Sequence, residues 1–199
     1  LQILMPEEAA SYSIANAPLG VPHYELHLRH RPHQRSSEQL LKMLREQGEI
    51  PLFLPMGQCH VEKLTLTKPV IFLCQGTGFA PAKAMIEHWL AQGEVPPITL
   101  GWLTRTKADY YLEALARHWE QHVPGFRYFP YTSEASELAI SAAVLNEAAF
   151  NPSNVQIVLA GAFDRMRRFK EALVAQGIPS EHLWGDALER TPGAVKIWR

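Results

Sequence analysis

Residues 68–90 read KPVIFLCQGTGFAPAKAMIEHWL, and this stretch predicts how the second half of the chain folds. Val70 to Cys74 form a short unbroken apolar run, which is typical of a parallel strand buried on both faces. Gly76-Thr77-Gly78 interrupts the run, and Pro81 stands where a first helical residue needs no backbone N–H. Residues 82–89 then place apolar side chains three and four positions apart, on one face of a helix. The stretch therefore predicts a strand, a glycine turn and a helix.

A glycine turn of this kind lets a ligand approach the backbone closely. The helix that follows offers unpaired N–H groups to an anion such as a phosphate. The turn lacks both the GxGxxG pattern and the Walker lysine, so it matches neither standard phosphate-binding motif. A plain strand-to-helix turn, in which the glycines serve only the backbone geometry, is an equally open interpretation of this stretch.

The composition is that of an ordinary globular protein, with 199 residues of which 47% are hydrophobic and 20% charged. Nineteen basic residues against 20 acidic ones leave a net charge of −1, so nothing indicates nucleic acid or an anionic membrane as partner. No apolar run approaches the roughly 20 residues that a membrane helix needs. Cys59 and Cys74 give no disulfide framework, and we therefore expect a reducing, cytoplasmic location.

The order of the expected elements divides the chain near residues 65–68. Before this boundary come short extended runs and one helix, which begins at Ser36 or Ser37 and ends near Gly48. The apolar positions of this helix are Leu40, Leu41 and Leu44. The segment Tyr24–His30 alternates between apolar and polar residues and predicts a half-buried antiparallel strand. The first part therefore reads as an antiparallel β module.

After the boundary, strand patterns and helix patterns alternate, which predicts a parallel sheet covered by helices on both faces. Ligands of such sheets gather at the carboxyl ends of the strands, where the strand order reverses. We expect the turns after Cys74 and Leu159 to lie side by side at that point. The expected strands are 70–74, 98–103, 126–131, 155–159 and a short one near 182–184, and the expected helices are 81–90, 107–121, 137–148 and 165–176. The inward residues of the helix 107–121 are expected to be Tyr111, Leu112, Leu115 and Trp119.

Several segments, taken in order over nearly the whole chain, resemble the ferredoxin–NADP reductase superfamily and most closely its NAD(P)H–flavin reductases. Gly76 to Pro81 is close to the family's GGTGxAP nucleotide turn. Tyr12-Ser13-Ile14-Ala15-Asn16 resembles the R-x-Y-S flavin motif. Ala160-Gly161-Ala162 with Met166 resembles the later C-G-x-P-x-x-M segment. The order and spacing of these matches, more than any one of them, carry the resemblance.

The resemblance implies an α/β fold in two parts. Residues 1–66 would form a partial antiparallel β-barrel, the flavin-binding domain, and residues 67–199 a doubly wound parallel-sheet NAD(P)-binding domain. It also implies an oxidoreductase that transfers hydride from NAD(P)H to a flavin, FAD or FMN. Such an enzyme acts as a flavin reductase or as the reductase module of an electron-transfer system, with a protein or small molecule as electron acceptor.

Hydride would pass from C4 of the nicotinamide to N5 of the flavin, so the protein must stack and align two rings. By resemblance, Tyr12 lies along the flavin, and Ser13 is the catalytic candidate because its hydroxyl would bond near N5. No acid–base pair is required, and no metal is expected. The other implied cofactor-binding residues are Ile14, Ala15, Asn16, His27, Ser37, Gly76, Thr77, Gly78, Phe79, Arg105, Gly161 and Met166.

The chain departs from the family's pattern at several positions. Ala10 stands where the family has an arginine for the flavin phosphate, and the lost contact would cost about 1.5–3 kcal/mol of flavin affinity. Gln75 replaces the first glycine of the nucleotide turn, and Leu188 stands where many relatives have an aromatic residue. Leu1 already aligns inside the barrel, so we expect a fragment, a processed product or a sequence whose start is lost.

An open half-barrel exposes strand edges and apolar surface, so we expect it to be unstable or to pair with another chain, for example in a homodimer. A second hypothesis is a degenerate module that keeps nucleotide or partner binding and has lost the flavin.

Arg105 and Lys107 lie where a ribose or 2′-phosphate could bind, yet solvated loop charges are an equal alternative, and the choice between NADH and NADPH stays open. A metal site among His23, His27, His30 and His33 is disfavoured, because His27 and His30 fall on opposite faces of the expected strand.

Overall fold

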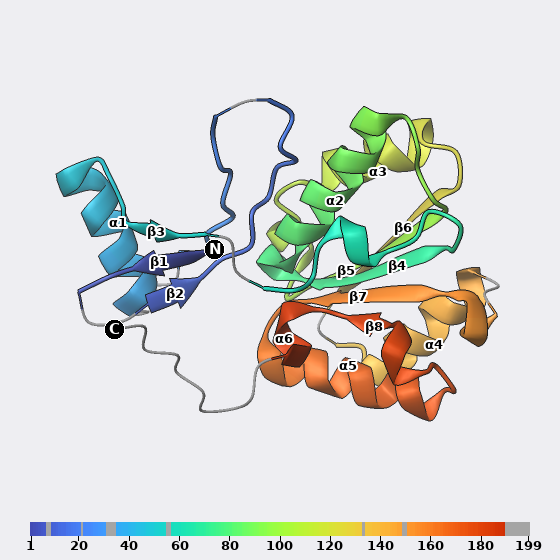
Figure 1. Cartoon of the computed structure of the whole chain (residues 1–199). Helices are drawn as coiled ribbons and strands as arrows, with labels where there is room; N and C mark the ends of the chain where they lie inside the picture. The colour runs from blue at the N-terminus through green and yellow to red at the C-terminus, as the bar shows by residue number, and fades with distance from the viewer. Residues whose placement is uncertain are drawn as a thin grey trace.

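A computed structural model of the chain shows an α/β fold with two sheets, as the sequence predicts (Figure 1). The smaller sheet is antiparallel and carries one helix, and the larger one is parallel and has helices on both faces. The structure describes residues 1–6, 9–20, 22–30, 35–54, 57–132, 134–148 and 151–189.

The β module is built on a short central strand. β1 (Gln2–Leu4) pairs antiparallel with β2 (Ala9–Ser11) on one side and with β3 (Leu52–Phe53) on the other. α1 (Arg35–Gln47) packs its apolar face against this sheet. The buried side chains of the module's small core are Leu1, Ile3, Met5, Leu40 and Met43.

Two expectations for the β module are wrong in detail. The segment 24–30 forms no strand and pairs only through a single bridge between Ile14 and Leu26. Its polar side chains contact the parallel-sheet half instead, as described below. Leu44, expected on the inward face of α1, is 43% exposed, because Met43 takes the buried position.

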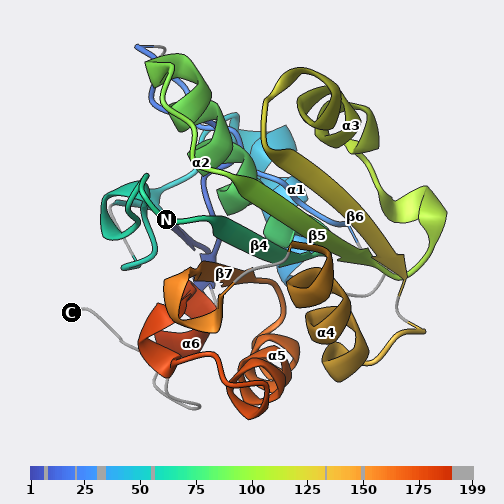
Figure 2. The same ribbon diagram turned by 90° about the vertical axis from the view of Figure 1, so that its right-hand side faces the viewer.

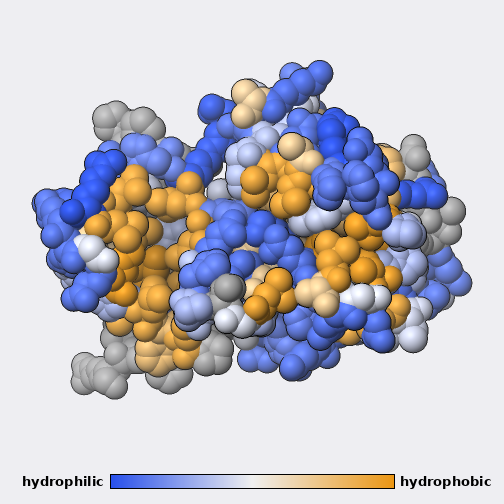
Figure 3. Space-filling model, turned by 90° about the horizontal axis from the view of Figure 1, so that it is seen from above, coloured by the Kyte–Doolittle hydropathy of each residue, from blue (hydrophilic) through white to orange (hydrophobic). Residues whose placement is uncertain are grey.

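The β module also leaves apolar surface uncovered, as expected for an open half-barrel. Leu4, Leu52 and Phe53 are between 41% and 48% exposed, although all three belong to its strands. Figure 3 shows apolar side chains gathered on this side of the molecule.

The parallel sheet has the strand order β6-β5-β4-β7-β8. The chain runs from the central β4 outward to β5 and β6, and then returns to add β7 and β8 on the other side of β4. The order therefore reverses between β4 and β7, which is where doubly wound sheets bind ligands. The strands are β4 (Val70–Gln75), β5 (Ile98–Thr104), β6 (Phe126–Thr132), β7 (Gln156–Ala160) and β8 (Leu183–Trp184).

Helices cover both faces of this sheet (Figure 2). α2 (Phe79–Gln92) and α3 (Glu113–His122) lie on one face, and α4 (Glu137–Ala148), α5 (Phe163–Ala175) and α6 (Asp186–Glu189) lie on the other. Each face has its own apolar core, since the strands are buried on both sides. Short 3₁₀ turns span Val61–Lys63, Gly76–Gly78, Lys107–Asp109, Pro152–Asn154 and Ser180–His182.

Two helix predictions are corrected. α2 begins at Phe79, two residues before Pro81, because the 3₁₀ turn of the glycine segment runs directly into it. Proline is tolerated at this third position, since the first turn has no intrahelical acceptors for its N–H groups. The helix expected over 107–121 is broken, because Thr106 and Asp109 form a capping box around a 3₁₀ turn and α3 starts only at residue 113. Tyr111, expected to point inward, is 44% exposed.

No helix in the described part of the chain is long and apolar enough to cross a membrane.

Candidate functional site

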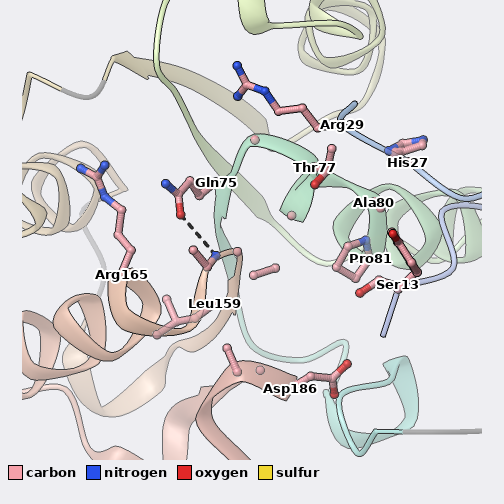
Figure 4. Close-up of a pocket in the computed structure, with 18 of the residues that line it drawn as sticks. Ser13, His27, Arg29, Gln75, Thr77, Ala80, Pro81, Leu159, Arg165 and Asp186 are labelled. Atoms are coloured by element: carbon pink, nitrogen blue, oxygen red, sulfur yellow. Dashed lines mark hydrogen bonds between the residues drawn. The ribbon is translucent and has the colours of Figure 1, made fainter. Parts of the chain in front are cut away.

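A cleft of about 1100 Å³ opens at the carboxyl ends of β4, β5 and β7, between the β module and the parallel sheet (Figure 4). Two chain segments that are far apart in sequence form its opposite walls: residues 11–13 with 27–30 on one side, and the turns after β4 and β7 on the other. Nine predicted site residues line it: Tyr12, Ser13, His27, Ser37, Gly76, Thr77, Gly78, Arg105 and Gly161.

The turns after β4 and β7 are packed against each other, as the sequence predicts. Cys74 pairs with Ala160 in the parallel ladder. A Cβ added to Gly78 would lie 2.0 Å from the Ala160 carbonyl oxygen, so only glycine permits this approach. Gly76 has φ +54° with nothing within 4 Å of the added Cβ, and its carbonyl accepts a hydrogen bond from the Trp102 indole at 2.9 Å.

Gln75 stands between these two turns. Its Oε1 accepts a hydrogen bond from the backbone N–H of Ala162 at 3.2 Å, shown as the dashed line in Figure 4. A Cβ added to Gly161 would lie 2.7 Å from the Gln75 Cβ and 3.0 Å from Met166 Cε. The sequence flagged Gln75 only as a departure from the nucleotide turn and gave it no contact.

Two predicted site residues lie beneath the cleft and do not line it. Phe79 is fully buried and stacks on the Trp102 ring, with centroids 4.2 Å apart. Met166 is fully buried under the Gly161 turn. Both therefore support the turns from below, and contact with a ligand stays a prediction for them.

Three further predicted residues, Ile14, Ala15 and Asn16, lie behind the wall that Tyr12 and Ser13 form. Ile14 packs against the small core of the β module, and Ala15 is fully buried. The Asn16 amide bonds to the next loop, since its Oδ1 accepts from the Glu25 N–H at 2.8 Å and its Nδ2 donates to the His23 carbonyl at 3.1 Å. These three residues thus shape and hold the wall.

The two halves of the molecule are joined beside the cleft by a nearly buried lysine that the sequence reasoning missed. The Lys83 side chain, on α2, is only 9% exposed. Its ammonium lies 2.9 Å from a Glu25 carboxylate oxygen, 2.9 Å from a Glu87 oxygen and 3.0 Å from the Ala15 carbonyl. Glu25 and Ala15 belong to the β module, so this one ammonium ties the β module to the helix after the glycine turn.

The pKa values in this cluster follow from those contacts. Burial acts to lower the pKa of Lys83, but the hydrogen bonds and charges of Glu25 and Glu87 outweigh it, so the pKa lies above its ordinary value of 10.5. Burial likewise acts to raise the pKa of Glu25, and Lys83 and His27 outweigh it, so the pKa falls below 4.5. The Lys83 ammonium and the Glu25 carboxylate are therefore both charged near neutral pH.

His27 forms a second link between the halves. Its Nε2 lies 2.8 Å from a Glu25 oxygen, and its Nδ1 lies 2.6 Å from the Tyr111 hydroxyl. Because a carboxylate only accepts hydrogen bonds, Nε2 carries a proton, and a neutral imidazole then accepts from the tyrosine at Nδ1. Burial raises the pKa of Tyr111, which keeps this hydroxyl protonated as a donor.

Arg29 completes the same face of the segment. Its guanidinium lies 2.8 Å from Asp109, whose pKa is lowered chiefly by the Thr106 hydroxyl and also by the nearby arginines. Glu25, His27 and Arg29 are thus the polar face that the alternating pattern predicts, although no strand forms there. The pattern could identify this face, but what it contacts depends on the packing of the two halves.

Cationic side chains gather around the cleft. Arg29, Arg105 and Arg165 line it, and the Arg165 guanidinium also lies 2.9 Å from Glu137. Asp186 is on the opposite side, where it accepts from the Cys59 N–H at 3.3 Å. Among the described residues no group of three or more histidine, cysteine or acidic side chains could hold a metal ion, and His33 lies outside the described part of the chain.

A sequence profile of the oxidoreductase NAD-binding domain family matches residues 72–171, about half of the chain. The chain belongs to the oxidoreductase NAD-binding domain family. The match contains both glycine turns, most of β4 and the whole of strands β5 to β7. The resemblance to the ferredoxin–NADP reductase superfamily, drawn from the motifs alone, is confirmed.

Comparison with known members of this family shows how far the likeness extends. The chain is 34% identical over 121 residues to reductase component 1 of terephthalate 1,2-dioxygenase from Comamonas sp, a match that covers 61% of this chain and 35% of that protein. It is 23% identical over 199 residues to the NAD(P)H-flavin reductase of Vibrio harveyi, covering 94% and 84%. The chain spans 35–40% of the length of several curated relatives that it matches.

The crystal structure of an Amycolatopsis cytochrome P450 reductase has the same fold. It superposes with a TM-score of 0.69 over 93% of this chain and 58% of that one, at 19% sequence identity. The superposed part includes the β module as well as the parallel sheet, since it covers almost the whole chain.

Proposed function

We propose that this chain is the catalytic part of an NAD(P)H-dependent flavin oxidoreductase, in which hydride passes from NAD(P)H to FAD or FMN. It would act as a flavin reductase or as the reductase module of an electron-transfer system. One observation carries the proposal: a single large cleft brings the Tyr12-Ser13 wall of the β module opposite the glycine turns after β4 and β7. Two cofactors must meet in one cleft for hydride to pass between them.

The residues of the cleft fit a dinucleotide. α2 begins at the cleft, and Gly78, the residue before it, has no side chain that could cap the helix. Uncapped helix starts of this kind favour phosphate oxygens. The open space beside Gly76 leaves the backbone there accessible to a ligand. We propose that residues 67–199 form the NAD(P)-binding domain and that Arg105 faces the adenosine end of the nucleotide.

On the opposite wall, we propose that residues 1–66 form the flavin-binding domain and that Tyr12, Ser13, His27 and Ser37 face the flavin. The bound flavin supplies the hydride-accepting ring, which no side chain can replace. The protein's part is to orient: Ser13 presents a hydroxyl to the cleft, and His27 is fixed by Glu25 and Tyr111. No side chain needs to move a proton for hydride transfer.

The similar proteins bear on the electron acceptor, and the cysteines bear on the cellular compartment. The terephthalate relative is the reductase component of a dioxygenase, which favours a protein acceptor, whereas the Vibrio harveyi relative is a flavin reductase. Cys59 and Cys74 form no disulfide, and we propose a reducing cytoplasm as the location.

The test is the oxidation of NADH and NADPH with added FAD, FMN or riboflavin, followed by absorbance. Wild type should turn over, Ser13→Ala should lose most of its kcat, and Ser180→Ala, at an exposed serine outside the cleft, should match wild type. Binding of ADP-ribose, measured by calorimetry, runs in parallel. Nucleotide binding without turnover under any flavin would contradict the enzyme and support the degenerate binding module.

A further inference from the structure

The side chain of Gln75 occupies a position in the cleft that a ligand could use. It is the last residue of β4, its side chain lines the cleft, and its Oε1 accepts from the Ala162 N–H at 3.2 Å (Figure 4). The carboxamide therefore bridges the two turns that form the nucleotide wall, and it lies beside Gly161.

The Ala162 N–H is a donor at the start of a helix. Ala162 precedes α5, which runs for 13 residues from Phe163, and alanine offers no side-chain oxygen to cap it. A backbone donor at such a position carries part of the positive end of the helix dipole and is well suited to a carbonyl or anionic oxygen. In this structure, the oxygen that takes it is that of Gln75.

We propose that Gln75 competes with the nicotinamide carboxamide for the Ala162 N–H and so sets the affinity for the nicotinamide end of the nucleotide. The inference rests on the proposed function, since it places a nicotinamide nucleotide in this cleft. A glutamine side chain ends in the same carboxamide group that nicotinamide carries, so both present a carbonyl oxygen of equal hydrogen-bonding character. Binding of the ligand must break the internal bond before it can form its own.

The bond is not needed to hold the two turns together. The parallel ladder already joins Cys74 to Ala160, and the close approach of Gly78 to the Ala160 carbonyl fixes the turns independently. Removing the Gln75 carboxamide should therefore leave the wall in place and free one donor. A purely structural bond would instead show as a loss of both stability and nucleotide binding.

The test compares two ligands that share phosphates and ribose but differ in nicotinamide. The affinities of NAD⁺ and ADP-ribose are measured by calorimetry for wild type, Gln75→Ala and Gln75→Met, with Gln121→Ala, at an exposed position of α3, as control. Both Gln75 variants free the N–H, whereas methionine keeps most of the side-chain volume. We expect ADP-ribose to bind all four proteins alike, and NAD⁺ to bind both Gln75 variants roughly three- to tenfold more tightly than wild type, the range that one hydrogen bond accounts for.

An unchanged or lowered ratio of NAD⁺ to ADP-ribose affinity in the Gln75 variants would overturn the inference. A rise in Gln75→Ala alone would also overturn it, because space and not the N–H would then be limiting. ADP-ribose binding shows that each variant is folded and that the nucleotide site exists. If wild type bound neither ligand, the proposed function would fail, and this inference with it.

Discussion

Replacing Lys83 with methionine should weaken the attachment of the β module to the parallel-sheet half, while the volume of the side chain stays nearly the same. The Lys83 side chain is 9% exposed, and its ammonium has three partners at 2.9–3.0 Å: Glu25, Glu87 and the Ala15 carbonyl. Methionine keeps most of the apolar stem and removes all three contacts. The variant therefore tests whether this single charge holds the β module against α2.

The expected loss of stability follows from those contacts. Each hydrogen bond between charged partners is worth about 1.5–3 kcal/mol, but Glu25 and Glu87 are 38% and 27% exposed and can regain water. We therefore expect a total of about 2–4 kcal/mol rather than the sum. For a chain of this length the change lowers Tm by roughly 5–15 °C.

Thermal unfolding of Lys83→Met and Lys42→Met is the assay. Lys42 and Glu46 form the same i,i+4 pair on α1, but at 3.9 Å and with side chains 70% and 60% exposed, so its loss should change stability by less than about 0.5 kcal/mol. If Lys83→Met unfolded at the same temperature as Lys42→Met, the argument that Lys83 joins the halves would be refuted.

The stability difference between wild type and Lys83→Met should also depend on pH. The Glu25 pKa is lowered in the folded protein, so its contribution is present above about pH 4.5 and is lost as the pH falls through the folded pKa. The Lys83 pKa is raised, so its contribution is complete below about pH 10.5 and is lost as the pH rises through the folded pKa. The difference should be largest between these limits and shrink on both sides, and a difference constant with pH would point to packing alone.

Three further predictions address the cleft. Gly78→Ala should destabilise the fold by about 1–3 kcal/mol and weaken ADP-ribose binding, because the new Cβ meets the Ala160 carbonyl, and unchanged unfolding and binding would refute that close approach. Tyr111→Phe should lower stability by about 0.5–1.5 kcal/mol through the lost bond to His27, measured by thermal unfolding, and a neutral result would remove that link between the halves. Arg105→Ala should raise KM roughly tenfold or more for NADPH and little for NADH if this guanidinium meets a 2′-phosphate, whereas equal changes for both coenzymes would show a solvated loop charge.

The sequence predicted the parallel-sheet half well because its inner strands β4, β5 and β7 are buried along nearly their whole length. Val70 to Cys74 is buried throughout, and α4 begins and ends at the residues expected, 137 and 148. A short run that is apolar at every position is readily interpreted as a strand buried on both faces. The turns after β4 and β7 also meet as expected, since the strand order alone places them together.

The sequence predicted the residues between the two halves less well, because the position of each side chain there depends on its contacts with the other half. The alternating segment 24–30 has the pattern of a strand, yet only Leu26 makes a bridge. Tyr111 has the spacing of an inward helical residue, yet its hydroxyl lies against His27. In both cases a polar contact between the halves outweighs the local pattern, and the local sequence does not contain the partner.

The same reasoning explains why the contacts of Gln75 and Lys83 were not predicted, although both residues stand within the stretch that predicts the fold. Hydrophobic periodicity ignores polar residues, and motif comparison records Gln75 only as a missing glycine. Yet the Gln75 carboxamide accepts the hydrogen bond of the Ala162 N–H before α5, and the Lys83 ammonium joins the two walls through Glu25 and the Ala15 carbonyl. Glycines and apolar strands thus set the backbone of the turns after β4 and β7. The side chain of Gln75 controls whether the Ala162 N–H is open to a ligand, and that of Lys83 holds the opposite wall in position. Variation at these two positions should therefore change nucleotide affinity and the stability of the joined halves while the fold itself is kept.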